Sequence, residues 1–251
     1  MTSEPLNDDN HIIKFADDTY LIIPATNSST SDLEIDHIQS WAASNNLLLN
    51  RTKSKELVFY TQLAKLNAAQ PPPLCQGIER VESLTALGVT VYNRSSAAEY
   101  VTNVLSSCSG LLYALRILRT HGMSASAISL YDVFRATVAA KLLYCSPAWS
   151  RFCSAADINR LGAFLERCKR YGYCPDDFPN ISELFSDADD QLFSRISQNV
   201  THVKKPLLPT RNQQSYNLRD RRHNFVLIEK NSQINHRHFI IRQLYKLKYS
   251  Y

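Results

Sequence analysis

The first 94 residues carry short apolar runs separated by polar segments, a pattern typical of strands rather than long helices. Several runs are rich in Ile, Val, Tyr and Phe, which favour strands. Strands are predicted at residues 11–14, 19–23, 57–60 and 81–92, the last as a short hairpin or strand pair. Ser31 and Glu34 have the spacing of a capping box, so a helix is predicted to begin there and to end at Asn45 and Asn46.

From residue 96 the apolar positions recur every three or four residues, which predicts helices. Ser96 and Glu99 form a second candidate capping box, and Pro147 is expected to end the second helix. Helices are predicted at residues 96–121, 125–144, 155–170 and 181–200. Short loops join the first three, so we expect them to form an antiparallel bundle.

The predicted fold class is therefore α+β. Residues 1–94 should form hairpins and a helix, residues 95–174 a helical bundle, and residues 175–251 a C-terminal extension. The extension is expected to be partly irregular, with ordered islands at 224–228 and 238–247.

Two adjacent acids, Asp17 and Asp18, lie between the first two predicted strands. A hairpin there would present both carboxylates at its tip, where like charges repel one another. Tight hairpin turns also favour glycine, so an Asp-Asp turn is expected to be strained. A divalent cation would offset the repulsion, which makes the pair a candidate metal site. The alternative is a solvated turn with two acids.

Four blocks of this sequence resemble, in the same order, the conserved blocks of reverse transcriptases from non-LTR (LINE-like, jockey-like) retrotransposons. The first is the [FY]-A-D-D motif of the catalytic hairpin, and the second is the family's W…N-x-L-x-L-N-x-x-K-[ST] block. The third is a Leu-Gly hairpin, and the fourth an L-x-Y-x-S-P-x-W stretch. They occur here at Phe15–Asp18, within residues 38–55, at Leu84–Val89 and at Tyr144–Trp149.

The resemblance implies a partial palm in residues 1–94, a thumb in residues 95–174 and a C-terminal extension. It implies that Asp17 and Asp18 bind Mg²⁺ in a two-metal nucleotidyl transfer in the full-length enzyme, and that Mg²⁺ binding by this chain is weak or absent. It also places Lys53 near the triphosphate of the incoming nucleotide; the alternative is a solvated lysine in a basic turn. The family's primer grip corresponds to Leu87, Gly88 and Val89, for which an ordinary hairpin is the competing interpretation.

In the family, a further metal-binding aspartate and a Ser-Pro block come before the catalytic hairpin. Here only ten residues precede it. We therefore expect a fragment of an RNA-directed DNA polymerase that is inactive alone, so whether this chain is itself an enzyme is left open. Two other hypotheses are a non-enzymatic nucleic-acid-binding remnant and a non-functional relic of a decayed element.

Positive charge is concentrated near the end of the chain. The whole sequence has a net charge of +5, but residues 201–251 contain eleven Lys or Arg against two acids, a net +9 that leaves −4 for the first 200 residues. Such asymmetry indicates a polyanionic partner, which the resemblance implies to be an RNA template and a DNA primer. The candidate phosphate contacts are Arg160, Arg167, Lys169, Arg170, Arg219, Arg221 and Arg222. The alternative for each is a solvated, solubilising side chain.

The rest of the sequence argues against a zinc-finger, secreted or membrane protein. Six cysteines are scattered without zinc-finger spacing, so reduced structural thiols are expected. The polar, acidic start differs from a signal peptide, and no run of about 18 apolar residues predicts a membrane span. We therefore expect an intracellular protein of the nucleus or cytoplasm.

Overall fold

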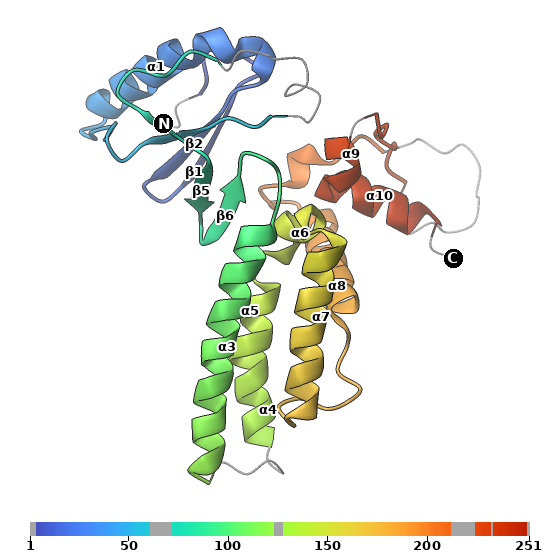
Figure 1. Ribbon diagram of the computed structural model, residues 1–251. Helices are drawn as coiled ribbons and strands as arrows, with labels where there is room; N and C mark the ends of the chain where they lie inside the picture. The colour runs from blue at the N-terminus through green and yellow to red at the C-terminus, as the bar shows by residue number, and fades with distance from the viewer. Residues whose placement is uncertain (1–3, 61–71, 123–127, 212–223, 232, 250–251) are drawn as a thin grey trace, which may run out of the picture. The chain divides into compact units, whose positions relative to one another are not determined.

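The computed structural model describes residues 4–60, 72–122, 128–211, 224–231 and 233–249. The chain divides into two compact units, Met1–Ser95 and Ser96–Tyr251 (Figure 1). The first unit contains all of the named strands and one long helix, and the second is helical. This mixture confirms the α+β fold class.

Within the described part of the first unit, the strands form three separate two-stranded sheets. β1 (His11–Phe15) pairs antiparallel with β2 (Asp18–Ile22), and β5 (Ser83–Ala86) pairs antiparallel with β6 (Val89–Tyr92). Both predicted hairpins are thus confirmed. β3 (Lys55–Leu57) pairs in parallel with β4 (Glu79–Val81). The strand predicted at 57–60 was misplaced, because only Leu57 of that range belongs to β3.

Helix α1 (Ser31–Ser44) follows a 3₁₀ turn, η1 (Ala25–Thr30), and ends at Asn45 as predicted. The predicted capping box was wrong, since the N-cap residue is Thr30 and it makes no side-chain cap bond. Glu34 is instead fully buried. Its carboxylate accepts hydrogen bonds at 3.0 Å from the backbone N–H groups of Leu6 and Asn7, and at 2.8 Å from the Asn10 amide.

These bonds attach the segment before β1 to α1. Asn10 is itself 1% exposed; its amide also donates to the Thr30 hydroxyl, and its oxygen accepts from Asn27. Burial raises the pKa of Glu34, but the bonds from Asn10, Leu6 and Asn7 outweigh it and hold the pKa below its ordinary value. The carboxylate therefore stays ionised and fully hydrogen-bonded inside the unit.

In the second unit, α3 (Ala98–Thr120) lies beside a broken helical run and α7 (Ala155–Arg170), as Figure 1 shows. The broken run consists of α4 (Ile128–Phe134), a π-helical turn η2 (Arg135–Ala139) and α5 (Ala140–Leu143). α8 (Ile181–Gln198) packs against α5, α6 and α7. The helices predicted near 96–121, 155–170 and 181–200 are confirmed, and the described part of 125–144 is helical as well.

The bundle closes over large apolar side chains that come from every helix. Their periodicity matches the predicted stripes, because one side of each helix faces its neighbours. The buried side chains include Val101, Val104, Cys108, Leu115, Phe134, Val138, Leu142, Leu161, Leu165 and Cys168. α7 and α8 begin with true capping boxes, Ser154 with Asp157 and Asn180 with Glu183.

Two predictions about helix ends in this unit were wrong. α3 begins at Ala98 with Ala97 as N-cap and without a side-chain cap, so Ser96 and Glu99 form no capping box. The run that ends at Leu143 is terminated by Cys145, whose φ is +50°, rather than by Pro147. Pro147 instead lies in the first turn of the short helix α6 (Ser146–Trp149), where its missing N–H is harmless. A 3₁₀ turn, η3 (Ser150–Phe152), then leads to α7.

The C-terminal extension packs on α8 through α10 (Phe239–Tyr249), which covers the island predicted at 238–247. Between them lies a small apolar cluster of Phe193, Phe225, Ile240 and Leu244. The island at 224–228 contains no strand; Phe225 forms a single bridge with Arg211. The remaining described elements are η4 (Lys205–Leu207) and α9 (Gln233–Arg237).

Basic residues of α10 pair with acids of α8. Arg242 Nη1 lies 2.5 Å from Asp189 Oδ2, with side chains only 10% and 4% exposed, and Lys246 Nζ lies 2.7 Å from Asp190 Oδ1. Part of the positive charge of the extension is therefore neutralised within the chain.

Among the described helices, α3 alone has the length and apolar composition of a membrane span. One such helix is a weak indication, because the core helix of a bundle has the same properties. The apolar stripe of α3 packs against α4, α5 and α7.

Replacing Glu34 by Gln should lower the free energy of unfolding by about 2 kcal/mol, since a charged acceptor of three hydrogen bonds is lost. The folded pKa lies below the ordinary value of 4.5, so this stabilisation is complete above that pH and lost as pH falls through the folded pKa. Urea unfolding from pH 7 to pH 3 would measure both effects. Glu82→Gln, at an exposed site, is the control. Equal loss in both variants would contradict the assigned role of Glu34.

Candidate functional site

The acid pair lies at the closed end of the β1–β2 hairpin. Phe15 pairs with Asp18, so Ala16 and Asp17 form a two-residue loop and Asp18 is the first residue of β2. The left-handed residue of the turn is Ala16, with φ +53°, and neither acid has a positive φ. The predicted backbone strain therefore falls on Ala16, the residue before the acids. The left-handed conformation costs an L-residue about 1–2 kcal/mol.

Asp18 belongs to a definite face of the sheet. Because side chains alternate along a strand, it shares that face with Tyr20 and with Ile13 and Phe15 of β1. Ile13 and Phe15 are 52% and 60% exposed, and both acids are exposed. The opposite face holds Lys14, whose ammonium group lies 3.6 Å from the centre of the Trp41 ring on α1. The acid-bearing face is thus the face that α1 leaves open.

Tyr20 connects the hairpin to the Leu-Gly turn. Its hydroxyl lies 3.5 Å from Asp18 Oδ2 and also interacts with the backbone of Leu87. Burial is the largest influence that raises the pKa of Tyr20, followed by the negative charge of Asp18 and their hydrogen bond, while the Leu87 contact opposes them. Sequence analysis missed this residue, although its position two residues after Asp18 on one strand was a usable signal.

The Leu87–Gly88 turn closes the β5–β6 hairpin with positive φ at both residues, +48° and +79°. Two left-handed residues are the signature of a type I′ turn, which glycine favours. Leu87 is 46% exposed, whereas Val89 is buried. The type I′ turn by itself explains the glycine at position 88. Gly88 therefore does not distinguish a primer grip from an ordinary hairpin.

Lys53 lies in a turn built on Asn50. The Asn50 side chain accepts from the Lys53 backbone N–H at 3.1 Å and from the Thr52 hydroxyl at 2.7 Å. Arg51 holds the turn to α1 through Asp36, at 2.5 Å, and Gln39. The Lys53 side chain is exposed, and the described contacts do not join it to Asp17 or Asp18. The structure therefore unites the hairpin with the Leu-Gly turn but leaves Lys53 apart.

The basic residues of α7 are largely engaged within the second unit. Arg160 Nη2 donates to the Thr102 hydroxyl at 2.9 Å, and Arg167 Nη2 to the Ser109 hydroxyl at 3.3 Å, so both bind α7 to α3. Lys169 pairs with Glu166 at 3.2 Å. Arg170 is exposed, and the described residues provide it with no partner. Arg219, Arg221 and Arg222 lie outside the described residues.

The acid pair supplies hard oxygen donors, which suit Mg²⁺. Across the described ranges, however, no group of three or more His, Cys, Asp or Glu side chains could hold a metal ion. Asp17 and Asp18 therefore fit the metal as part of a ligand set rather than as a complete one.

The cysteines of the second unit include buried free thiols. Burial raises the pKa of Cys108 to about 11 and that of Cys168 to about 12. These thiols stay protonated at neutral pH, which makes them poor metal ligands and poor nucleophiles.

Comparison with known proteins identifies no relative: no protein-family model, curated protein or solved structure matches the chain.

Replacing Asp18 by Asn should lower the pKa of Tyr20, because a negative charge and a hydrogen bond to the phenol are removed. The pKa can be followed by NMR titration of protein labelled at the tyrosine ring carbon, with the Tyr20 signal assigned by its loss in Tyr20→Phe. Asp17→Asn is the matched control and should leave that titration unchanged. A Tyr20 titration unaffected by Asp18→Asn would disprove the contact.

Proposed function

We propose that the β1–β2 hairpin contributes metal ligands to an RNA-directed DNA polymerase of the non-LTR retrotransposon type. The proposal rests chiefly on the contact of Tyr20 with both Asp18 and Leu87. That contact brings together the two motifs that the resemblance assigns to metal binding and to the primer end.

Each group has a definite chemical role in this proposal. Asp17 and Asp18 supply carboxylate oxygens, and bound Mg²⁺ would activate the primer hydroxyl and stabilise the departing pyrophosphate. The Leu87–Gly88 turn presents backbone without a side chain at Gly88, which permits close approach of a nucleic-acid strand. Lys53 makes no described contact with Asp17 or Asp18, so the role of its ammonium group in neutralising the phosphates rests on the resemblance alone. Residues 95–174 would act as the thumb.

Two carboxylates make an incomplete set of ligands for two metal ions. Within the described residues, β1 and β2 form a sheet of only two strands, so each has an unpaired edge to which a further strand can add. A third carboxylate carried by such a strand would complete the site. We therefore expect this chain to bind metal weakly and to extend no primer without that carboxylate.

Binding of Mn²⁺, a paramagnetic substitute for Mg²⁺, tests the hairpin directly. Added Mn²⁺ should broaden the amide NMR signals of Ala16 to Tyr20 before any others, and Asp17→Asn combined with Asp18→Asn should remove the effect. Asp8 and Asp9 provide an internal control, because they are also adjacent, exposed acids of the first unit. Equal broadening around both pairs would contradict a metal-binding role for the hairpin.

Primer extension on an RNA template, combined with the Mn²⁺ experiment, distinguishes three hypotheses: a polymerase fragment, a non-enzymatic nucleic-acid-binding remnant and a non-functional relic. Extension by the wild-type chain that is lost in Asp17→Asn would mean that the ligand set is complete here, against our expectation. Selective Mn²⁺ binding at the hairpin without extension is the expected result. Nucleic-acid binding without selective Mn²⁺ binding would favour the non-enzymatic remnant, and the absence of both would favour the relic.

A further inference from the structure

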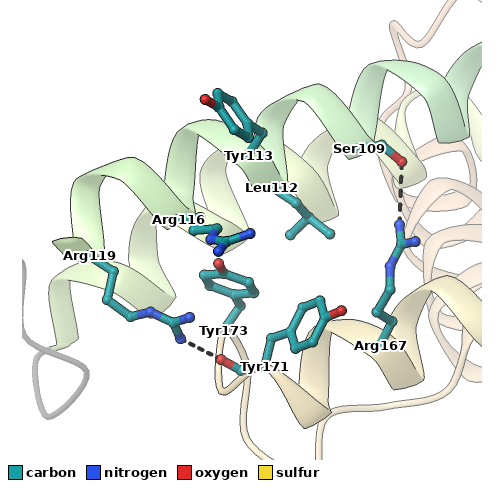
Figure 2. Close-up of a pocket in the computed structure, with 8 residues that line it drawn as sticks. All are labelled: Ser109, Leu112, Tyr113, Arg116, Arg119, Arg167, Tyr171 and Tyr173. Carbon is teal, nitrogen blue, oxygen red and sulfur yellow. Dashed lines mark hydrogen bonds between the residues drawn. The ribbon is translucent and has the colours of Figure 1, made fainter.

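A pocket of about 510 Å³ lies in the second unit, between one face of α3, the C-terminal end of α7 and the segment that follows it (Figure 2). This volume is within the range of ligand sites in proteins, about 300–1,000 Å³. Its lining consists of three arginines, three tyrosines, one serine and one leucine, without an acid: Ser109, Leu112, Tyr113, Arg116, Arg119, Arg167, Tyr171 and Tyr173.

The three arginines gather positive charge that the described part of the chain does not neutralise. Arg116, Arg119 and Arg167 form no ion pair with any described acid. Arg116 is exposed and also has no hydrogen-bond partner among the described residues. Arg167 Nε is buried and likewise unpaired there. Like charges collected without a counter-charge favour an anionic ligand.

Two of these guanidinium groups are held in place by the protein. Arg119 Nη1 donates to the Tyr171 carbonyl at 2.6 Å, and its guanidinium carbon lies 4.9 Å from the centre of the Tyr173 ring. Arg167 donates to Ser109 and lies 5.1 Å from the centre of the Phe164 ring. Their orientation is therefore set before a ligand arrives, which reduces the entropy lost on binding.

The tyrosines add an aromatic surface beside the charge. Tyr173 is 2% exposed and forms an edge-to-face pair with Tyr171, at 6.3 Å between ring centres. Tyr171 is 54% exposed, and Figure 2 shows its ring in the space between Arg119 and Arg167, whereas Tyr113 points away. An exposed ring next to fixed guanidinium groups can stack on a base while the phosphates meet the arginines.

We infer that this pocket binds single-stranded nucleic acid, with a phosphodiester on Arg116 and Arg119 and an unpaired base on Tyr171. A single strand fits better than a duplex, because the bases of a duplex are stacked inside and leave no free face for the ring. The inference does not depend on the metal chemistry of the hairpin. Of the residues that support it, the sequence had singled out Arg167, whereas Arg116, Arg119 and Tyr171 emerge from the structure.

The test is fluorescence anisotropy of a labelled 12-nucleotide oligo(U) with the full chain. Arg116→Ala should weaken binding about tenfold, since one charge-assisted contact is lost. The slope of log affinity against log salt should also fall by about 0.7. Tyr171→Ala should weaken binding by about fivefold or more, whereas Tyr171→Phe keeps the ring and should stay within about twofold of wild type.

Arg195→Ala is the matched control, because Arg195 is an exposed arginine on α8 away from the pocket lining. Thermal unfolding by circular dichroism verifies that each variant is folded. The inference is overturned if wild type fails to bind, if Arg116→Ala and Arg195→Ala weaken binding equally, or if an abasic oligomer binds as tightly as oligo(U). Tighter binding of a phosphotyrosine peptide would also overturn it. The Mn²⁺ experiment on the hairpin is unaffected by any of these results.

Discussion

The first unit depends on a buried carboxylate more than on an apolar core. Among its described residues, the buried apolar side chains are few, namely Ile38, Ala42, Cys75 and Val89. Glu34, by contrast, receives bonds from two backbone N–H groups and from Asn10, and thereby attaches the segment that leads into β1. A buried charge is costly unless it is fully hydrogen-bonded, so this arrangement specifies a single position for the segment. The attached segment leads directly into the acid-bearing hairpin.

The β1–β2 hairpin departs in part from the usual distribution of residues on a half-covered sheet: apolar Ile12 and Leu21 share the face of Lys14, but apolar Ile13 and Phe15 lie on the open face. The face toward α1 includes a lysine, Lys14, which lies over the Trp41 ring, while Ile13 and Phe15 are exposed beside Asp18. Cation–π contact compensates for placing an ammonium group against the helix. Exposed apolar residues around an acid indicate a surface for interaction. Tyr20 lies on the same face and contacts the backbone of Leu87, so the two hairpins meet there.

The basic side chains of the second unit have different surroundings at the α8–α10 contact and along α7. At the α8–α10 contact, Asp189 and Asp190 neutralise Arg242 and Lys246, so cations there stabilise packing. On α7, Arg160 and Arg167 bind α3 through hydroxyl groups. Near the C-terminal end of α7, by contrast, several arginines meet beside an exposed ring without an acid among the described lining residues. This contrast, rather than total charge, identifies the surface suited to a polyanion.

The sequence by itself determined the features that depend on short-range periodicity. The α3 and α7 helices and both hairpins follow from apolar spacing, which encodes the buried side of an element whatever it packs against. The tertiary structure decided what local pattern could not. Glu34 matched a capping box but bonds to residues 27 and 28 positions away, because burial made those partners available. Arg119 meets Tyr171 from 52 positions away, and Tyr20 meets Leu87 from the neighbouring hairpin. Such contacts depend on how elements pack, and therefore only the folded chain places these residues together.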